Sequence, residues 1–200
     1  MNTNKSVAFF DTQFRKQVAA GDFVLNPFET TCLPHVRGRV LDFGCGLGNL
    51  AIAAARRGLD VTAVDASEAA ITRIRKAATD EHLRIDAQCA EIGSYTIPGQ
   101  FDTIVAIGLL MFFPRENALG LLSRIQAHVT DGGTAIVNTL TEGTTYMGMF
   151  EPGHYHLFGK DELRDLFAGW KVLHFTHDNF AAPEGTTKTF ATIVAQKNSP

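Results

Sequence analysis

"VLDFGCGLGNLAIAAARRGLDVTAVDAS", residues 40–67, contains two apolar runs separated by a glycine-rich turn and an alanine-rich segment. The pattern predicts a strand, a helix and a second strand at residues 38–43, 49–58 and 60–65. Ser67 is suited to be the N-cap of another helix that runs to about Thr79. Strands separated by helices predict parallel pairing with right-handed crossovers.

The same alternation continues along the chain. We expect further strands at residues 83–89, 101–109 and 134–139, with a helix at 114–129 and a turn at 131–133. After a helix at 160–169, strands at 170–177 and 188–196 are joined by residues 178–187 and read as a hairpin. The predicted fold is α/β, a doubly wound and mostly parallel seven-stranded sheet that ends in an antiparallel hairpin.

We expect one domain over residues 1–200, because no repeat or low-complexity linker divides the chain. Within it we distinguish an N-terminal helical cap (1–37), a cofactor-binding core (38–139), a substrate lid (141–159) and a C-terminal helix and hairpin (160–197). Phe10, Phe14 and Val18 recur at helical spacing in the cap. The lid is a long connection rich in methionine and aromatic residues, a composition that argues against disorder.

Composition excludes several classes of function. The net charge of -3 and the absence of any block of five like charges disfavour nucleic acid as a partner. The longest apolar run, residues 104–113, is well below the roughly 20 residues that span a bilayer, so no membrane association is expected. The three cysteines are widely separated and read as reduced thiols, with no metal site. We therefore expect a cytoplasmic protein.

The glycine-rich turn is the candidate ligand loop. Gly44, Gly46 and Gly48 permit positive φ and a close approach of the backbone to a ligand. Their G-x-G-x-G spacing differs from the G-x-G-x-x-G of dinucleotide-binding loops. Asp42 precedes the glycines and would repel a pyrophosphate, whereas Asp65 ends the second strand, where a carboxylate accepts ribose hydroxyls.

The stretch "VLDFGCGLGNLA" followed by "VTAVDAS" resembles the glycine-rich motif of the class I S-adenosylmethionine-dependent methyltransferases. For this cofactor, Asp42 can attract the ammonium of the methionine part and Asp65 can accept both ribose hydroxyls. The resemblance also implies that Glu91 and the backbone of Ile92 face the adenine. The implied cofactor-binding set is Asp42, Gly44, Cys45, Gly46, Gly48, Asp65, Ala66, Glu91, Ile92 and Ile107.

The C-terminal half resembles the tellurite-resistance methyltransferases. The similarity lies in "GLLMFFPRE", "DGGTAIVNTL", "YHLFGKDELRDLFAGWKV" and "FATIVAQK". Members that resemble the best-known form of that family carry a His-Arg pair in the final hairpin, but "DNFAAPEGTTK" has neither residue, and Lys188 is the cation of that region. The departure argues against tellurite and other oxyanions as the acceptor.

Catalysis by an activated sulfonium donor depends mainly on positioning, so an obvious base need not exist. His154, Tyr155 and His156 in the predicted lid are the candidate catalytic residues. The predicted function is methyl transfer from S-adenosylmethionine, with S-adenosylhomocysteine as product, to an oxygen, nitrogen, sulfur or metalloid centre of a small molecule. A nicotinamide-dependent oxidoreductase and a non-catalytic S-adenosylmethionine-binding module remain alternatives, and we expect a monomer or homodimer.

Overall fold

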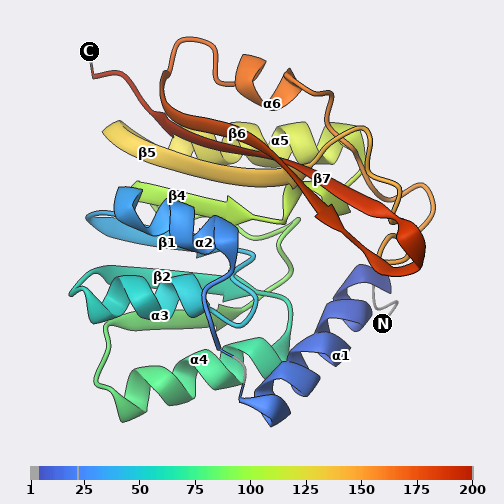
Figure 1. Cartoon of the computed structure of the whole chain (residues 1–200). Coiled ribbons are helices and arrows are strands. Elements are labelled where there is room, and N and C mark those ends of the chain that lie inside the picture. The colour runs from blue at the N-terminus through green and yellow to red at the C-terminus, as the bar shows by residue number, and fades with distance from the viewer. Residues whose placement is uncertain (1–4, 22, 200) are drawn as a thin grey trace.

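The computed structural model describes residues 5–21 and 23–199 and contains one seven-stranded sheet (Figure 1). Its order is β3-β2-β1-β4-β5-β7-β6. The strands are β1 (Arg39–Phe43), β2 (Asp60–Asp65), β3 (Ile85–Cys89), β4 (Phe101–Ile107), β5 (Val129–Leu140), β6 (Lys171–Ala181) and β7 (Thr187–Gln196). The first five pair in parallel, and β7 is antiparallel to both β5 and β6. The predicted fold class is therefore confirmed. Residues 1–4 of the predicted cap lie outside the described residues.

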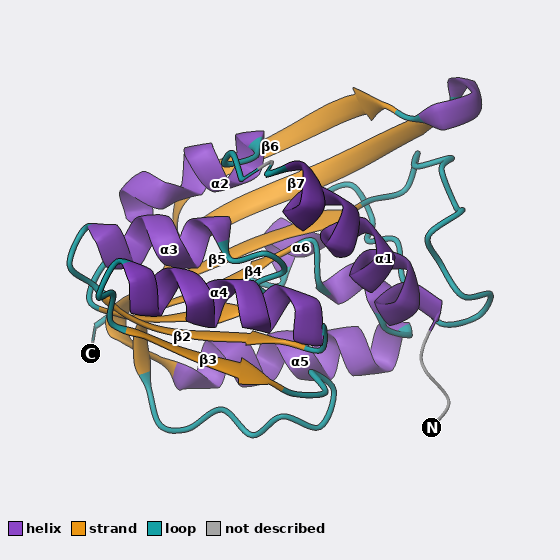
Figure 2. Cartoon of the chain, turned by 90° about the horizontal axis from the view of Figure 1, so that it is seen from below, coloured by secondary structure: helices purple, strands orange, loops and turns teal. Residues whose placement is uncertain are grey.

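Helices cover both faces of the sheet (Figure 2). They are α1 (Lys5–Ala20), α2 (Pro27–Cys32), α3 (Asn49–Arg56), α4 (Glu68–Asp80), α5 (Arg115–His128) and α6 (Glu162–Asp165). Alternate residues of β1 face opposite layers: Val40 packs with the residues of α3 and α4, whereas Leu41 and Phe43 pack with those of α5. In the part of the chain that the structure describes, no helix has the length and apolar character needed to cross a membrane.

Local interactions fix the glycine loop between β1 and α3. The backbone N–H groups of Gly44 and Cys45 both donate to the carbonyl of Val64 in β2, at 2.8 and 3.0 Å. Gly48 has φ +70°, and a Cβ atom there would lie 2.5 Å from Ile74 of α4. Only glycine fits this position, because the backbone is left-handed and α4 packs directly against it. The loop is thus held against β2 and α4 together.

Several predicted boundaries differ in the structure. Residues 131–133 form a bulge within β5, because the β4 register moves from Phe101↔Val129 to Thr103↔Thr134. The glycines of the bulge then bond Lys197, with Gly132 N donating to its carbonyl at 3.0 Å. The predicted helix at 160–169 is reduced to the single turn of α6.

The C-terminal hairpin is also longer than predicted. Residues 178–181, expected in the connection, pair with β7 as far as Ala181↔Thr187. Pairing between β5 and β7 ends earlier, at Leu140↔Phe190. The tip of the β6–β7 hairpin therefore projects beyond the end of β5, on the side of the sheet where α1 lies (Figure 1).

Candidate functional site

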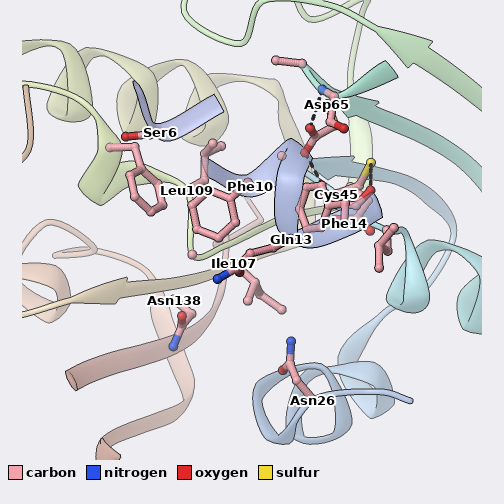
Figure 3. A pocket seen from close by; sticks show the side chains of 18 of the residues that line it. Ser6, Phe10, Gln13, Phe14, Asn26, Cys45, Asp65, Ile107, Leu109 and Asn138 are labelled. Carbon is pink, nitrogen blue, oxygen red and sulfur yellow. Dashed lines mark hydrogen bonds between the residues drawn. The ribbon is translucent and has the colours of Figure 1, made fainter. Parts of the chain in front are cut away.

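A cavity of about 430 Å³ lies at the carboxyl ends of β1, β2, β4 and β5. This volume is within the range of sites for small ligands, and the place is where open parallel sheets bind them. Figure 3 shows residues from β2, β4, β5 and α1 around the cavity. Nine of the ten predicted cofactor-binding residues line it, namely Asp42, Gly44, Cys45, Gly46, Asp65, Ala66, Glu91, Ile92 and Ile107. Gly48 instead packs against Ile74.

Asp65 holds the glycine loop by its carboxylate. One oxygen accepts from Gly46 N at 2.8 Å and the other accepts from Ser67 N at 2.8 Å. Burial raises the pKa of Asp65, while the hydrogen bonds from Ser67, Gly46 and the backbone of Ala66 lower it. A carboxylate has about four acceptor positions and three are used by these donors, so it can still accept from a ligand.

Asp42 is the most buried carboxyl of the cavity, with 4% of its surface exposed. Its pKa is raised to about 8, chiefly by burial and in addition by the negative charges of Glu29 and Asp65. A hydrogen bond from the backbone of Ala51 opposes this effect. Near neutral pH the empty site therefore holds Asp42 largely protonated, and a cationic ligand would favour its ionised form.

Glu29 was not predicted as a site residue. It belongs to a capping box in which Glu29 N donates to Asn26 Oδ1 at 2.9 Å and Asn26 N donates to Glu29 Oε2 at 2.7 Å. Burial raises the pKa of this carboxyl as well. The spacing Asn26-Pro-Phe-Glu29 could have identified the helix start, but its position beside Asp42 depends on the tertiary fold.

Cys45 lies in the same wall of the cavity and is buried. Burial raises its thiol pKa well above the ordinary value, and the carboxylates of Asp42 and Asp65 raise it further. The side chain is therefore a protonated thiol.

Helix α1 closes the cavity from the side opposite the sheet (Figure 3). A Cβ atom at Gly46, where φ is +50°, would lie 3.1 Å from the Phe14 ring of α1. Ser67 Oγ donates to Asp11 Oδ1 of α1 at 2.6 Å. At the other end of the helix, Ser6 Oγ donates to the carbonyl of Met149 at 3.2 Å.

The three candidate catalytic residues do not line the cavity among the residues described. His154 is exposed, and its Nδ1 lies 3.4 Å from the carbonyl of Pro152. Tyr155 stacks on Phe150 at 4.9 Å between ring centroids. His156 packs on Phe158, and its Nε2 lies 3.4 Å from Glu162 Oε2. Tyr155 and His156 thus pack on aromatic residues of the lid itself, and the catalytic role of the three residues stays a prediction.

Among the polar residues that line the cavity without belonging to the predicted set are two from the C-terminal half of the sheet. Asn138 comes from β5 and Lys188 from β7. Asn138 stands within an apolar strand, and its hydrogen-bond partner is 54 residues away in the chain. The sequence identified Lys188 only as the cation of the hairpin region and did not predict that it lines the cavity. Met149 is the residue of the predicted lid that reaches the wall, and Phe112 and Phe190 add aromatic surface.

The class I methyltransferase fold has this sheet order, with an antiparallel β7 beside β5. The acidic cavity beside the glycine loop lies where that fold binds its cofactor. Residues 40–133 match the family model described as "Methyltransferase domain". The chain therefore carries a methyltransferase domain of the class I, S-adenosylmethionine-dependent type, and its recognition from sequence is confirmed.

Particular relatives agree with this class. The chain is 32% identical over 129 residues to a ubiquinone biosynthesis O-methyltransferase of Nitrobacter winogradskyi, covering 64% of this chain and 48% of the relative. It is 28% identical over 168 residues to "Hemagglutinin 1" of Eikenella corrodens, covering 80% of this chain and 54% of that protein. It thus spans about half the length of these curated relatives.

Solved structures show the same fold. TehB from Haemophilus influenzae superposes with a TM-score of 0.76 at 21% identity, over 91% of this chain and 65% of TehB. The 1,6-didemethyltoxoflavin-N1-methyltransferase of Burkholderia thailandensis, solved with 1,6-didemethyltoxoflavin and S-adenosylhomocysteine, gives a TM-score of 0.69 at 19% identity, over 96% and 88% of the two chains.

Proposed function

We propose that this protein transfers the methyl group of S-adenosylmethionine to a nucleophile on a small molecule and releases S-adenosylhomocysteine. The observation that carries the proposal is the acidic end of the cavity. Asp42, Asp65 and Glu29 lie there together, and each has a pKa raised by burial. Clustered buried carboxyl groups suit a ligand that brings positive charge with it.

The residues of the acidic end fit this cofactor. The carboxylate of Asp42 would bind the ammonium of the methionine part, and that of Asp65 would accept from the ribose hydroxyls. Glu91 and Ile92 follow β3 and would face the adenine. When bound, the cofactor supplies an activated methyl group on a sulfonium.

The chain's own contribution is to hold and enclose the reactants. Phe10 and Phe14 of α1 cover the cavity, and Met149 and Phe112 complete an apolar wall. Such a wall limits the access of water to the reacting atoms and restricts the acceptor to orientations close to the attacking geometry. Since the candidate histidines and tyrosine lie outside the cavity, we propose positioning as the main source of rate acceleration.

The alternatives are less well supported. A nicotinamide dinucleotide would bring a pyrophosphate with two negative charges beside Asp42 and Glu29, which is unfavourable in a buried site. A binding module without turnover would use the same acidic end and differs only in forming no product. We also propose a cytoplasmic monomer or homodimer that binds no nucleic acid, supported by the net charge of -3 and by three cysteines described as free thiols.

Calorimetric titration tests the proposal. We expect saturable binding of S-adenosylmethionine and S-adenosylhomocysteine, and no binding of a nicotinamide dinucleotide at the same concentrations. A screen of phenols, amines, thiols and oxyanions for S-adenosylhomocysteine release then tests turnover. Binding of the nicotinamide dinucleotide alone would contradict the proposal, and binding without product from any nucleophile would favour the non-catalytic module.

A further inference from the structure

Asn138 presents an unused hydrogen-bond acceptor to the cavity. It lies on β5, paired with Ile107 of β4 on one side and with Thr192 of β7 on the other, and its surface is 0% exposed. Its Nδ2 donates to Thr192 Oγ1 at 2.9 Å, which fixes the amide plane. Its Oδ1 is buried and has no hydrogen-bond partner. A buried oxygen without a partner is unfavourable, so a ligand that donates to Oδ1 would remove this penalty.

Lys188 presents an uncompensated positive charge to the same cavity. The ammonium lies 4.7 Å from the centre of the Tyr146 ring, and no carboxylate of the described residues lies within ion-pair distance of it. Lys188 is half-buried, and this burial lowers the pKa of its ammonium. A partly desolvated cation without a counterion is suited to bind an anionic group of a ligand.

The two groups belong to one row of side chains. Thr192, Phe190 and Lys188 alternate along β7, so they share the face that carries Asn138's partner. Lys188 lies four positions from Thr192, which corresponds to about 13 Å along the strand. Phe190 lies between them, with its ring centroid 4.7 Å from that of Phe28. The row therefore runs from an acceptor through an aromatic surface to a cation.

The hairpin extension places this row along the wall of the cavity. Pairing between β5 and β7 ends at Leu140↔Phe190, so Lys188 lies on the part of the hairpin that projects past β5. Asn138 lies next to Ile107, at the sheet edge that also holds the acidic end. The acceptor end of the row is thus nearer to the proposed cofactor site than the cationic end.

From this arrangement, and on the basis of the proposed function, we propose that the methyl acceptor is an elongated aromatic acid. Its reacting hydroxyl or amine donates to Asn138 Oδ1, its ring lies against Phe190, and its carboxylate binds Lys188. In the transfer, the acceptor atom forms a bond to the methyl carbon as the carbon–sulfur bond breaks. The bonding electron pair stays on sulfur, and the acceptor's proton leaves to solvent. A compact oxyanion such as tellurite cannot reach both ends of the row.

The test uses 3,4-dihydroxycinnamate and its neutral amide, each titrated into the full chain saturated with S-adenosylhomocysteine. We expect the carboxylate to bind about tenfold more tightly than the amide, because only the carboxylate pairs with the Lys188 ammonium. Lys188→Met should remove this preference, and Lys188→Arg should keep most of it. Lys171→Met is the matched control, since Lys171 is exposed on the neighbouring strand β6.

Asn138→Leu tests the other end of the row. It removes the acceptor at similar volume, so both probes should bind more weakly while the affinity for S-adenosylhomocysteine is unchanged. Equal affinities for the carboxylate and the amide in the unmodified chain would overturn the proposal, as would binding of neither probe when S-adenosylhomocysteine is bound. Failure of S-adenosylhomocysteine itself to bind would instead overturn the proposed function.

Discussion

Replacing Asp42 with asparagine should stabilise the empty protein and weaken its affinity for the cofactor. The Asp42 carboxyl has an ordinary pKa of 3.8 and a pKa of about 8 in the folded chain. Between these values the folded state holds a proton that the unfolded state has released. As the pH rises through that window, the free energy of unfolding therefore falls by about 1.4 kcal/mol for each pH unit.

The magnitude follows from the width of the window. Between pH 3.8 and pH 7, the ionisation of Asp42 in the unfolded state lowers the free energy of unfolding by about 4 kcal/mol in total. Asparagine cannot ionise and does not lose this stability. We therefore expect Asp42→Asn to be more stable than the unmodified chain at pH 7 by about 2 to 4 kcal/mol, and this advantage to shrink by about 3 kcal/mol at pH 5. The titrations of Glu29 and Asp65 occur in both proteins and largely cancel in the comparison.

Urea unfolding at pH 5, 6 and 7 measures this difference directly. A gap between the two proteins that does not change with pH would refute the assignment of a raised pKa to Asp42. Calorimetry in two buffers of different ionisation enthalpy supplies the second readout. Binding of S-adenosylmethionine at pH 7 should release about one proton from the unmodified chain and almost none from the variant.

Three further substitutions test the same site. Asp65→Ala should weaken S-adenosylhomocysteine binding about 30- to 150-fold in calorimetry, and an unchanged affinity would exclude its carboxylate from the site. Gly46→Val should abolish binding with an unchanged circular dichroism spectrum, because φ is +50° and α1 leaves no room for the added branch; normal binding would show that the loop has another role. Asp11→Ala removes the partner of Ser67 and should speed S-adenosylhomocysteine release about two- to tenfold in surface plasmon resonance. Thr12→Ala, whose hydroxyl bonds only within α1, is its control, and equal release rates in the two variants would refute the role of the contact.

The sequence predicts the strands, the order of the elements and the residues at the acidic end of the cavity, because their signals are local. The glycines, Asp42 and Asp65 lie within 24 residues of one another, and the strand ends bring them to one edge. The length of the hairpin was not accessible, since residues 178–181 pair with β7 despite a composition typical of a connection. Only the partner strand supplies the hydrogen bonds that keep such a segment extended.

The positions of Asn138 and Glu29 in the cavity could not be predicted, because they depend on contacts between distant parts of the chain. Asn138 meets Thr192 through the neighbour relation of β5 and β7, and Glu29 meets Asp42 because α2 packs over β1. For the histidines of the lid, residue type suggested a base, whereas the contacts of His156 with Phe158 and Glu162 could not be read from the sequence.

The protonated state of Cys45 has a chemical consequence. A thiolate at Cys45 would be a strong nucleophile in the wall of the cavity that we propose to bind a methyl sulfonium. Burial is the main reason for the raised pKa of this thiol, and the carboxylates of Asp42 and Asp65, which would attract a cationic cofactor, raise it further. The burial and negative charge around Cys45 would thereby keep the protein from reacting with the methyl donor that we propose for this cavity.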